Sequence, residues 1–188
     1  NILKTIQKAE NISQNTQPDE CQGLPESNYT NKDWEDLGIY YPRELEVEDV
    51  IEITKSCEAE AFKTDKRISN SEGSTFSFSK NAHMIMNTNG AYGTHSSTDY
   101  SLSCIALAEE NKLMERDYWY SSTRDFLKLE EGSSIGRKAA ERVLSRLGAK
   151  TLKTRVCPVL FSPEMSASII SNFLSAISGS AIYKKSSF

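Results

Sequence analysis

The 188-residue chain carries 22 basic and 26 acidic side chains, a formal net charge of −4, and 38% hydrophobic residues. This composition is typical of a globular protein with a hydrophobic core, either one large domain or a small domain with extensions. The acidic balance disfavours nucleic-acid binding, because phosphate neutralisation needs a basic surface and no basic run exceeds two residues, as at Lys184-Lys185. No apolar run reaches the roughly 20 residues of a membrane-spanning helix, so we expect no membrane partner.

The four cysteines lie far apart and include no Cys-x-x-Cys pair; they are Cys21, Cys57, Cys104 and Cys157. This spacing predicts reduced, partly buried thiols in a cytosolic protein. The chain starts without Met on NILKTIQKAE, which has the pattern of a helix end, and it stops on YKKSSF without a cap or turn signal. We interpret it as a piece of a longer protein.

The first expected element is a helix over residues 1–12, and a polar segment rich in Asn, Gln and Ser follows it. Together they form a first region, residues 1–33, of helix end and linker. An apolar cluster from Trp34 to Tyr41 then needs a surface to pack on. The next helix, over residues 47–62, carries acidic residues in its first turn, where the helix dipole favours negative charge.

Residues 67–123 change to a two-residue period, which predicts β-strands. Turn signals at Lys80-Asn81, Asn89-Gly90 and Glu110-Asn111 divide this region into four strands of an antiparallel meander. One face of the meander carries mostly Ser, Thr and charged residues. Four apolar residues are expected to pack on the 47–62 helix: Phe76, Phe78, Tyr100 and Leu102.

A helix over residues 133–147, a strand from Arg155 to Phe161 and a last helix complete the pattern. The last helix has Ser162 as N-cap and Pro163 in its first turn, and its apolar residues are expected to face a core. The predicted fold class is therefore α+β: an antiparallel β-meander of four or more strands with helices packed on one face. Residues 34–188 form this α+β domain.

Catalytic and metal-binding motifs are weak. The candidate metal set is His83, His95 and Cys104, but half-buried strand histidines are far commoner than metal sites, and no His-Glu-x-x-His helix is present. Ser77 and Lys80 spell Ser-x-x-Lys, a nucleophile signature when it opens a helix, whereas here it ends a strand. What remains is a sheet with a polar face and an open edge, which could take a peptide as an added strand.

Four long segments resemble the PmbA branch of the TldD/PmbA family, which carries the label modulator of DNA gyrase. They are TDKRISNSEGSTFSF (64–78), SSTDYSLSCIALAEENKLMERDYWYSSTRD (96–125), IGRKAAERVLSRLG (135–148) and CPVLFSPEMSASIISNFLSAISGSAIYKKSSF (157–188). Their order and spacing make the resemblance specific, and it covers roughly residues 34–188.

The resemblance implies a cytoplasmic two-subunit metalloprotease that processes unfolded peptides inside an enclosed chamber. Zinc is expected on a His-Glu-x-x-x-His helix of a TldD-type paralogue. This chain lacks that motif, so we expect it to hold no cofactor and to form non-catalytic scaffold and chamber wall, partnered by a TldD-type subunit or by a second copy. The C-terminal domain of the parent protein would be absent from it.

Two other functions stay open. One is an interaction module that regulates DNA gyrase without a protease role. The other is an independent hydrolase that uses Ser77 and Lys80, or a zinc ion on His83 and His95.

The segment RISNSEG, residues 67–73, leads from the 47–62 helix into the meander. Arg67 is expected to pair with Glu72 or Asp65 and so fix the turn, and Gly73 to supply a backbone bend. Arg67, Asn70 and Arg116 are the candidate peptide-binding residues. No residue is assigned a catalytic or metal-binding role.

Overall fold

The computed structural model describes residues 1–19, 23–29 and 34–187; Cys21, part of the predicted linker and Phe188 lie outside the described residues. The chain divides into two compact units, Asn1–Ala149 and Lys150–Phe188. In the first unit the elements are α1 (Ile2–Gln14), η1 (Ser27–Tyr29), α2 (Val47–Thr64), β1 (Ile68–Met86), β2 (Tyr92–Glu110), β3 (Leu113–Thr123), η2 (Phe126–Lys128) and α3 (Gly132–Arg146).

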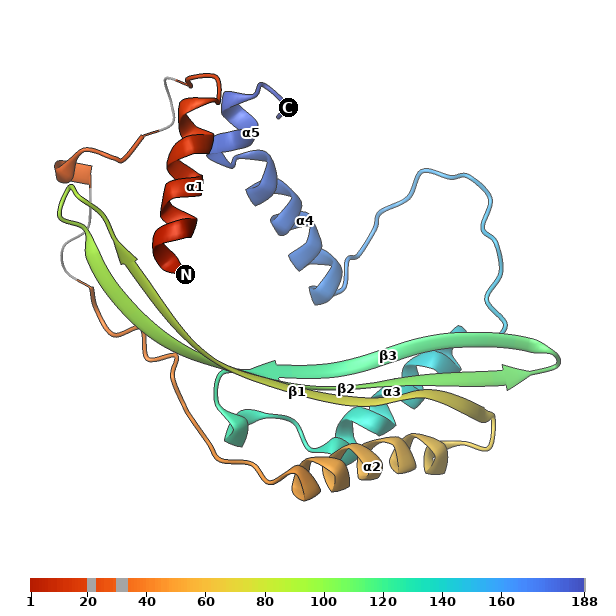
Figure 1. The fold of residues 1–188 in the computed structure, drawn as a ribbon. Coiled ribbons are helices and arrows are strands. Elements are labelled where there is room, and N and C mark those ends of the chain that lie inside the picture. Colours follow the sequence, from red (N-terminus) through yellow and green to blue (C-terminus); the bar gives the residue numbers. More distant parts are fainter. Residues whose placement is uncertain (20–22, 30–33, 188) are drawn as a thin grey trace. The chain divides into compact units, whose positions relative to one another are not determined.

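The strands form one antiparallel sheet in the order β1-β2-β3, and α2 and α3 lie on the same side of it (Figure 1). This arrangement confirms the α+β class. The predicted count of four or more strands is not confirmed, since the described residues form three strands.

The difference in strand number arises at Lys80-Asn81, which the sequence predicted as a turn. These residues continue β1, pairing opposite Thr98 and Ser97 of β2, so that the first two predicted strands are one strand of 19 residues. The predicted turn at Glu110-Asn111 is confirmed: Asn111 and Lys112 have φ of 53° and 65°, the left-handed values of a tight hairpin turn. The turn at Asn89-Gly90 is also confirmed, with Gly90 at φ 90°.

The hydrophobic core lies between the sheet and helices α2 and α3. Alternate residues of β2, among them Leu102, Cys104 and Ala106, have no exposed surface, and Cys57 of α2 joins them in the core. The two helices approach closely at Gly136 of α3, where a Cβ atom would collide with the carbonyl oxygen of Cys57. The core therefore depends on small residues where backbones meet.

The four apolar residues predicted to pack on α2 do share one face of the sheet, but the helices cover only part of it. Leu102 lies in the core, and Phe76 packs against that core. Phe78 is 49% exposed and stacks on Tyr100, which in turn contacts Phe126 of η2 at a centroid distance of 5.7 Å. Phe78 is thus not a core residue. Figure 1 shows that β1 and β2 extend beyond α2 and α3, so the helices do not cover the whole of this face.

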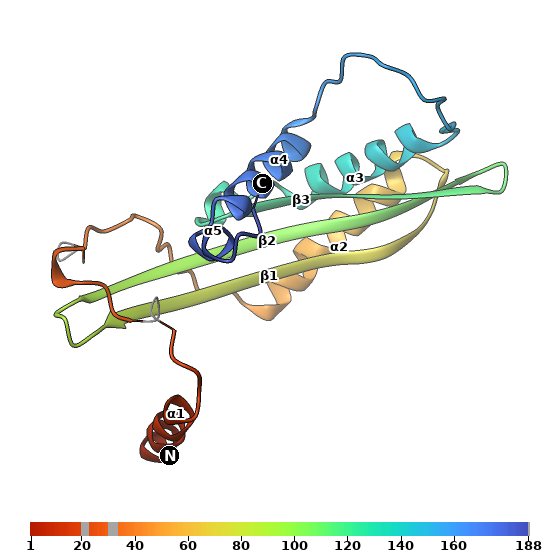
Figure 2. The same ribbon diagram turned by 90° about the horizontal axis from the view of Figure 1, so that it is seen from above.

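Residues 39–43, which we call the strap, run beside β2 beyond the point where β3 ends. The last β2–β3 pair joins Tyr100 to Thr123, and Figure 2 shows β1 and β2 continuing past it. From there the Thr98 N–H donates to the carbonyl of Ile39 (3.0 Å), and the Tyr41 N–H donates to the Thr98 hydroxyl (2.9 Å). The strap therefore satisfies part of the β2 edge that β3 leaves.

The second unit contains α4 (Pro163–Ala176) and α5 (Gly179–Tyr183). Ser162 caps α4 as predicted, its hydroxyl accepting from the Met165 N–H at 3.4 Å. The predicted strand from Arg155 to Phe161 does not form, since a strand needs a neighbour and the described part of this unit offers none. The apolar residues of α4 expected to face a core stay exposed, Phe173 among them.

No helix in the described ranges combines the length and the apolar character needed to cross a bilayer.

Candidate functional site

One face of the sheet is left uncovered by α2 and α3. Side chains alternate along a strand, so the β2 residues between the core residues point away from the helices. We call this surface the open face; its members include Asn70, Glu72, Thr75 and Ser77 of β1, Ser101, Ser103, Ile105 and Leu107 of β2, and Arg116, Tyr118, Tyr120 and Ser122 of β3. Hydroxyl groups line its middle, as the sequence predicted for one face of the meander.

Two of the three predicted peptide-binding residues lie on this face, at the end nearest the β2–β3 turn. Arg116 binds Glu72 through two hydrogen bonds of 2.7 Å each, a bidentate pair that reaches from β3 to β1 across the central strand. Asn70 accepts the Ser71 N–H with its side chain. Whether either residue contacts a peptide stays a prediction.

Arg67 lies just before β1 and is held by acidic neighbours. Its guanidinium binds Asp65 at 2.8 Å, as predicted, and Glu110 at 3.4 Å. The hydrogen bonds from Arg67 lower the pKa of Asp65 from its ordinary value of 3.8 to about 2. The alternative partner, Glu72, binds Arg116 instead. Arg67 therefore fixes the start of β1 through Asp65, which precedes the strand, and through Glu110 at the end of β2.

Gly73 supplies the backbone bend that the sequence predicted. Its φ is 98°, and the pairing of β1 with β2 shifts register between Ser71 and Gly73, which marks a β-bulge. The Ser71 hydroxyl accepts the Gly73 N–H at 2.8 Å and donates to the Ile105 carbonyl. The segment 67–73 thus shapes the start of β1 through a bend and a β-bulge.

The candidate metal set is not brought together. His83 and His95 lie directly opposite each other with rings stacked at 4.8 Å, but Cys104 is buried on the other face of β2. Within the described residues no group of three or more His, Cys, Asp or Glu side chains could hold a metal ion. His83, His95 and Cys104 therefore do not form a zinc ligand set.

The Ser-x-x-Lys pair is separated in the same way. Ser77 pairs opposite Ser101 and belongs to the open face, whereas Lys80 pairs opposite Thr98 and points to the other face. The Lys80 ammonium binds Glu44 at 2.8 Å. Lys80 cannot serve Ser77 as a base in this arrangement.

The cysteines within the described ranges, Cys57, Cys104 and Cys157, are free thiols, as predicted. Cys57 and Cys104 lie together in the core, where hydrogen bonding to Cys57 and burial raise the pKa of Cys104. Cys157 is exposed in the second unit, so the prediction of a partly buried thiol is wrong at this position.

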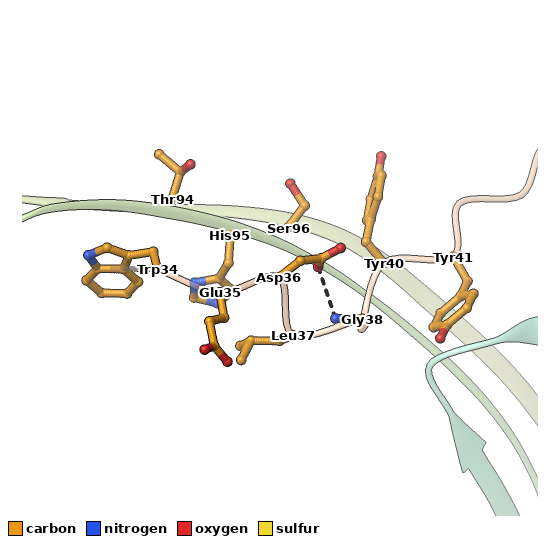
Figure 3. A pocket seen from close by; sticks show the side chains of 10 residues that line it. All are labelled: Trp34, Glu35, Asp36, Leu37, Gly38, Tyr40, Tyr41, Thr94, His95 and Ser96. Carbon is orange, nitrogen blue, oxygen red and sulfur yellow. Dashed lines mark hydrogen bonds between the residues drawn. The ribbon is translucent and has the colours of Figure 1, made fainter. Parts of the chain in front are cut away.

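A cavity of about 630 Å³ lies between the segment that leads into the strap and β2. Figure 3 shows its lining, which comes from residues 34–38, Tyr40 and Tyr41 on one side and from Thr94, His95 and Ser96 of β2 on the other. Trp34 lies flat against Gly93, where a Cβ atom would collide with the indole ring. This contact gives Trp34 a packing surface, whereas Leu37, Tyr40 and Tyr41 of the predicted apolar cluster stay largely exposed.

Sequence reasoning missed both the strap and this cavity. The residues that hold the strap, Thr98 and Tyr100, lie in a regular two-residue pattern that gives no sign of a partner 57 residues earlier in the chain. The one available signal was the apolar cluster, which had to pack somewhere.

Comparison with known proteins is consistent with this fold. The family described as PmbA/TldA metallopeptidase central domain matches residues 40–147. The metalloprotease PmbA of Escherichia coli O157:H7 is 35% identical over 187 residues, 100% of this chain and 42% of that protein. A PmbA homolog of Buchnera aphidicola subsp. Baizongia pistaciae is 39% identical over 173 residues, 91% of this chain and 38% of that protein. The chain thus spans about two fifths of the length of these curated relatives.

Two solved structures extend the likeness to three dimensions. A protein from Bacteroides thetaiotaomicron, described as a modulator of DNA gyrase, is 27% identical with a TM-score of 0.83 over 97% of this chain and 42% of that one. One from Thermotoga maritima with the same description is 23% identical with a TM-score of 0.62 over 70% of this chain and 30% of that one, a likeness of fold alone. Because the family match covers more than half of the sequence, the chain belongs to the PmbA/TldD family of metallopeptidases.

Proposed function

We propose that the chain is the non-catalytic scaffold and substrate-chamber portion of a TldD/PmbA-type metalloprotease that acts on unfolded peptides in the cytoplasm. The observation that carries this proposal is the open face: Ser101 and Ser103 are only half-buried, while their neighbour Leu102 is fully covered by the helices. A broad face lined with hydroxyls and tyrosines suits an extended peptide of varied sequence, because it offers hydrogen bonds without a demanding pocket.

The zinc would come from a TldD-type paralogue with a His-Glu-x-x-x-His helix, since this chain offers no set of three ligands in its described part. We further propose that Arg67, Asn70 and Arg116 contact the peptide, and that residues 1–33 link residues 34–188 to a preceding part of the parent. The chain spans about two fifths of the length of its curated relatives, so peptide cleavage would be a property of the whole assembly.

The test is to purify the chain alone and together with a TldD-type paralogue, and to measure zinc content and cleavage of an unfolded peptide. We expect cleavage only in the assembly, with zinc in proportion to the paralogue. Cleavage by the chain alone, or about one zinc per chain lost in His83→Ala, would overturn the proposal. Capture of DNA gyrase in place of the paralogue would favour the role that the description of its structural relatives names.

The peptide-contact residues need a separate measurement. In the assembly, Arg116→Met is expected to raise KM for the peptide with little change in zinc content. Lys63→Met is the control, because Lys63 lies on α2, away from the open face, and forms an exposed ion pair with Glu60 at 3.5 Å. Equal KM values for the two variants would show that Arg116 does not contact the peptide.

A further inference from the structure

The cavity beside the strap is a built feature of the first unit. The segment from Trp34 to Ile39, which forms one side of the cavity, is fixed to β2 at both ends. Trp34 lies on the backbone of Gly93, and the Ile39 carbonyl accepts the Thr98 N–H. Between them the Asp36 carboxylate accepts the Gly38 N–H at 3.0 Å, and Gly38 has the left-handed φ of 58° that this bend requires. The cavity is therefore held by hydrogen bonds and one aromatic contact.

The charge inside this cavity is one-sided. Glu35 and Asp36 line it, and in the described part of the chain neither carboxylate forms an ion pair. No Lys or Arg occurs among the ten lining residues. Two uncompensated carboxylates in a concave site attract a cation and repel an anion.

Aromatic rings add to this preference. Trp34 and Tyr40 belong to the lining, and both are roughly half exposed, so ring surface is available to a ligand. A ring face attracts ammonium and guanidinium groups by its quadrupole. At about 630 Å³ the cavity falls within the range of small-molecule sites and is far larger than a bare metal ion needs.

We propose that this cavity binds a basic group of a peptide, an arginine or lysine side chain or an amino-terminal ammonium, and that the group is attracted by the carboxylates of Glu35 and Asp36 and by the rings of Trp34 and Tyr40 that line the cavity (Figure 3). The inference rests on the proposed function, because the peptide is the substrate of the assembly, and it assigns a basic residue to that substrate. The shared chemistry is an organic cation with an apolar stem.

Trp34 makes the proposal measurable in the chain as it exists. The other tryptophan, Trp119, lies under Lys138 and Arg142 of α3, away from the cavity. Titration with acetyl-arginine amide or acetyl-lysine amide should change tryptophan emission saturably, and the change should vanish in Trp34→Phe. Trialanine amide with a free amino terminus, compared with its acetylated form, tests the ammonium source, and acetyl-norleucine amide is the neutral control.

Charge-neutral variants test the carboxylates. We expect Glu35→Gln combined with Asp36→Asn to weaken binding by about tenfold, while asparagine keeps an oxygen for the Gly38 N–H. Glu44→Gln is the matched control, because it removes a nearby negative charge that lies outside the cavity lining and pairs with Lys80. Circular dichroism verifies that each variant stays folded, and calorimetric titration supplies a signal that does not depend on Trp34.

Three results would overturn the inference: no saturable binding by either method, equal binding of norleucine, or an equal loss in Glu44→Gln, which would mean unspecific charge attraction. Its failure is distinct from failure of the proposed function. If the assembly cleaves neutral and basic peptides alike and the cavity binds neither, the basic subsite is wrong and the chamber role stands. If the assembly cleaves nothing, the chamber role fails, and the binding data still decide whether the cavity takes cations.

Discussion

The hydroxyl of Tyr100 is the strongest single test of how the strap is held. Tyr100 is completely buried; its hydroxyl donates to the carbonyl of Tyr41 at 3.0 Å and accepts the N–H of Arg43 at 3.1 Å. Tyr100→Phe keeps the ring in contact with Phe126 but leaves two partly buried backbone groups without partners. At roughly 1 kcal/mol for each group, we expect the free energy of unfolding to fall by about 2 kcal/mol.

Urea denaturation measures this loss. With a slope of roughly 2 kcal/mol per molar urea for a unit of this size, the midpoint should fall by about 1 M. Tyr118→Phe is the control, because Tyr118 is half exposed on the open face and its change should stay within about 0.5 kcal/mol. Hydrogen exchange should also quicken at the amides of Tyr41, Arg43 and Thr98. Equal midpoints for the two variants, with unchanged exchange, would refute the view that Tyr100 anchors the strap.

Two further predictions concern the core and the entry to the sheet. Gly136→Ala puts a methyl group against the carbonyl oxygen of Cys57, so we expect thermal unfolding to show a loss of about 2 kcal/mol in stability, despite the better helix propensity of alanine. The control, Gly179→Ala, has open space around the new methyl group and should be near neutral. A neutral Gly136→Ala would mean that α2 and α3 can move apart without cost. The pKa of Asp65 is lowered to about 2 by Arg67, so this pair stabilises the fold above pH 4 and the contribution is lost as the pH falls toward 2. Carboxyl NMR titration should find that Arg67→Gln raises the pKa of Asp65 toward 3.8 but not fully to it, because the backbone N–H of residue 67 still donates to the carboxylate. An unchanged low value would show that the Arg67 guanidinium is not the cause.

The helices were predictable because their signals are local. The three-to-four-residue apolar rhythm gave α2 within two residues of its end and α3 within one residue at each end, and Ser162 with Pro163 fixed the start of α4. The pair between Arg67 and Asp65 was also within reach, since the residues are two positions apart.

What failed depends on partners far away in the sequence. Lys80-Asn81 has turn residues, but pairing with β2 decides that the strand continues. The pair between Arg116 and Glu72 joins residues 44 positions apart, and nothing in either local pattern indicates it. The strand expected from Arg155 to Phe161 has residue types that favour strands. Residue types cannot show whether a neighbouring strand is present to pair with it.

The route of the chain into the strap has a consequence for the order of folding. The β2–β3 hairpin closes through a two-residue turn, whereas the strap meets Thr98 and Tyr100 across 57 and 59 residues, with α2 and β1 between them. Closing a long loop costs more entropy and is repaid only when its target already exists, so the strap docks after the sheet has formed. By the same reasoning we expect the strap to detach before the sheet when the fold loosens. The cavity beside the strap then exists only while the strap is docked, and a ligand bound there would oppose that detachment.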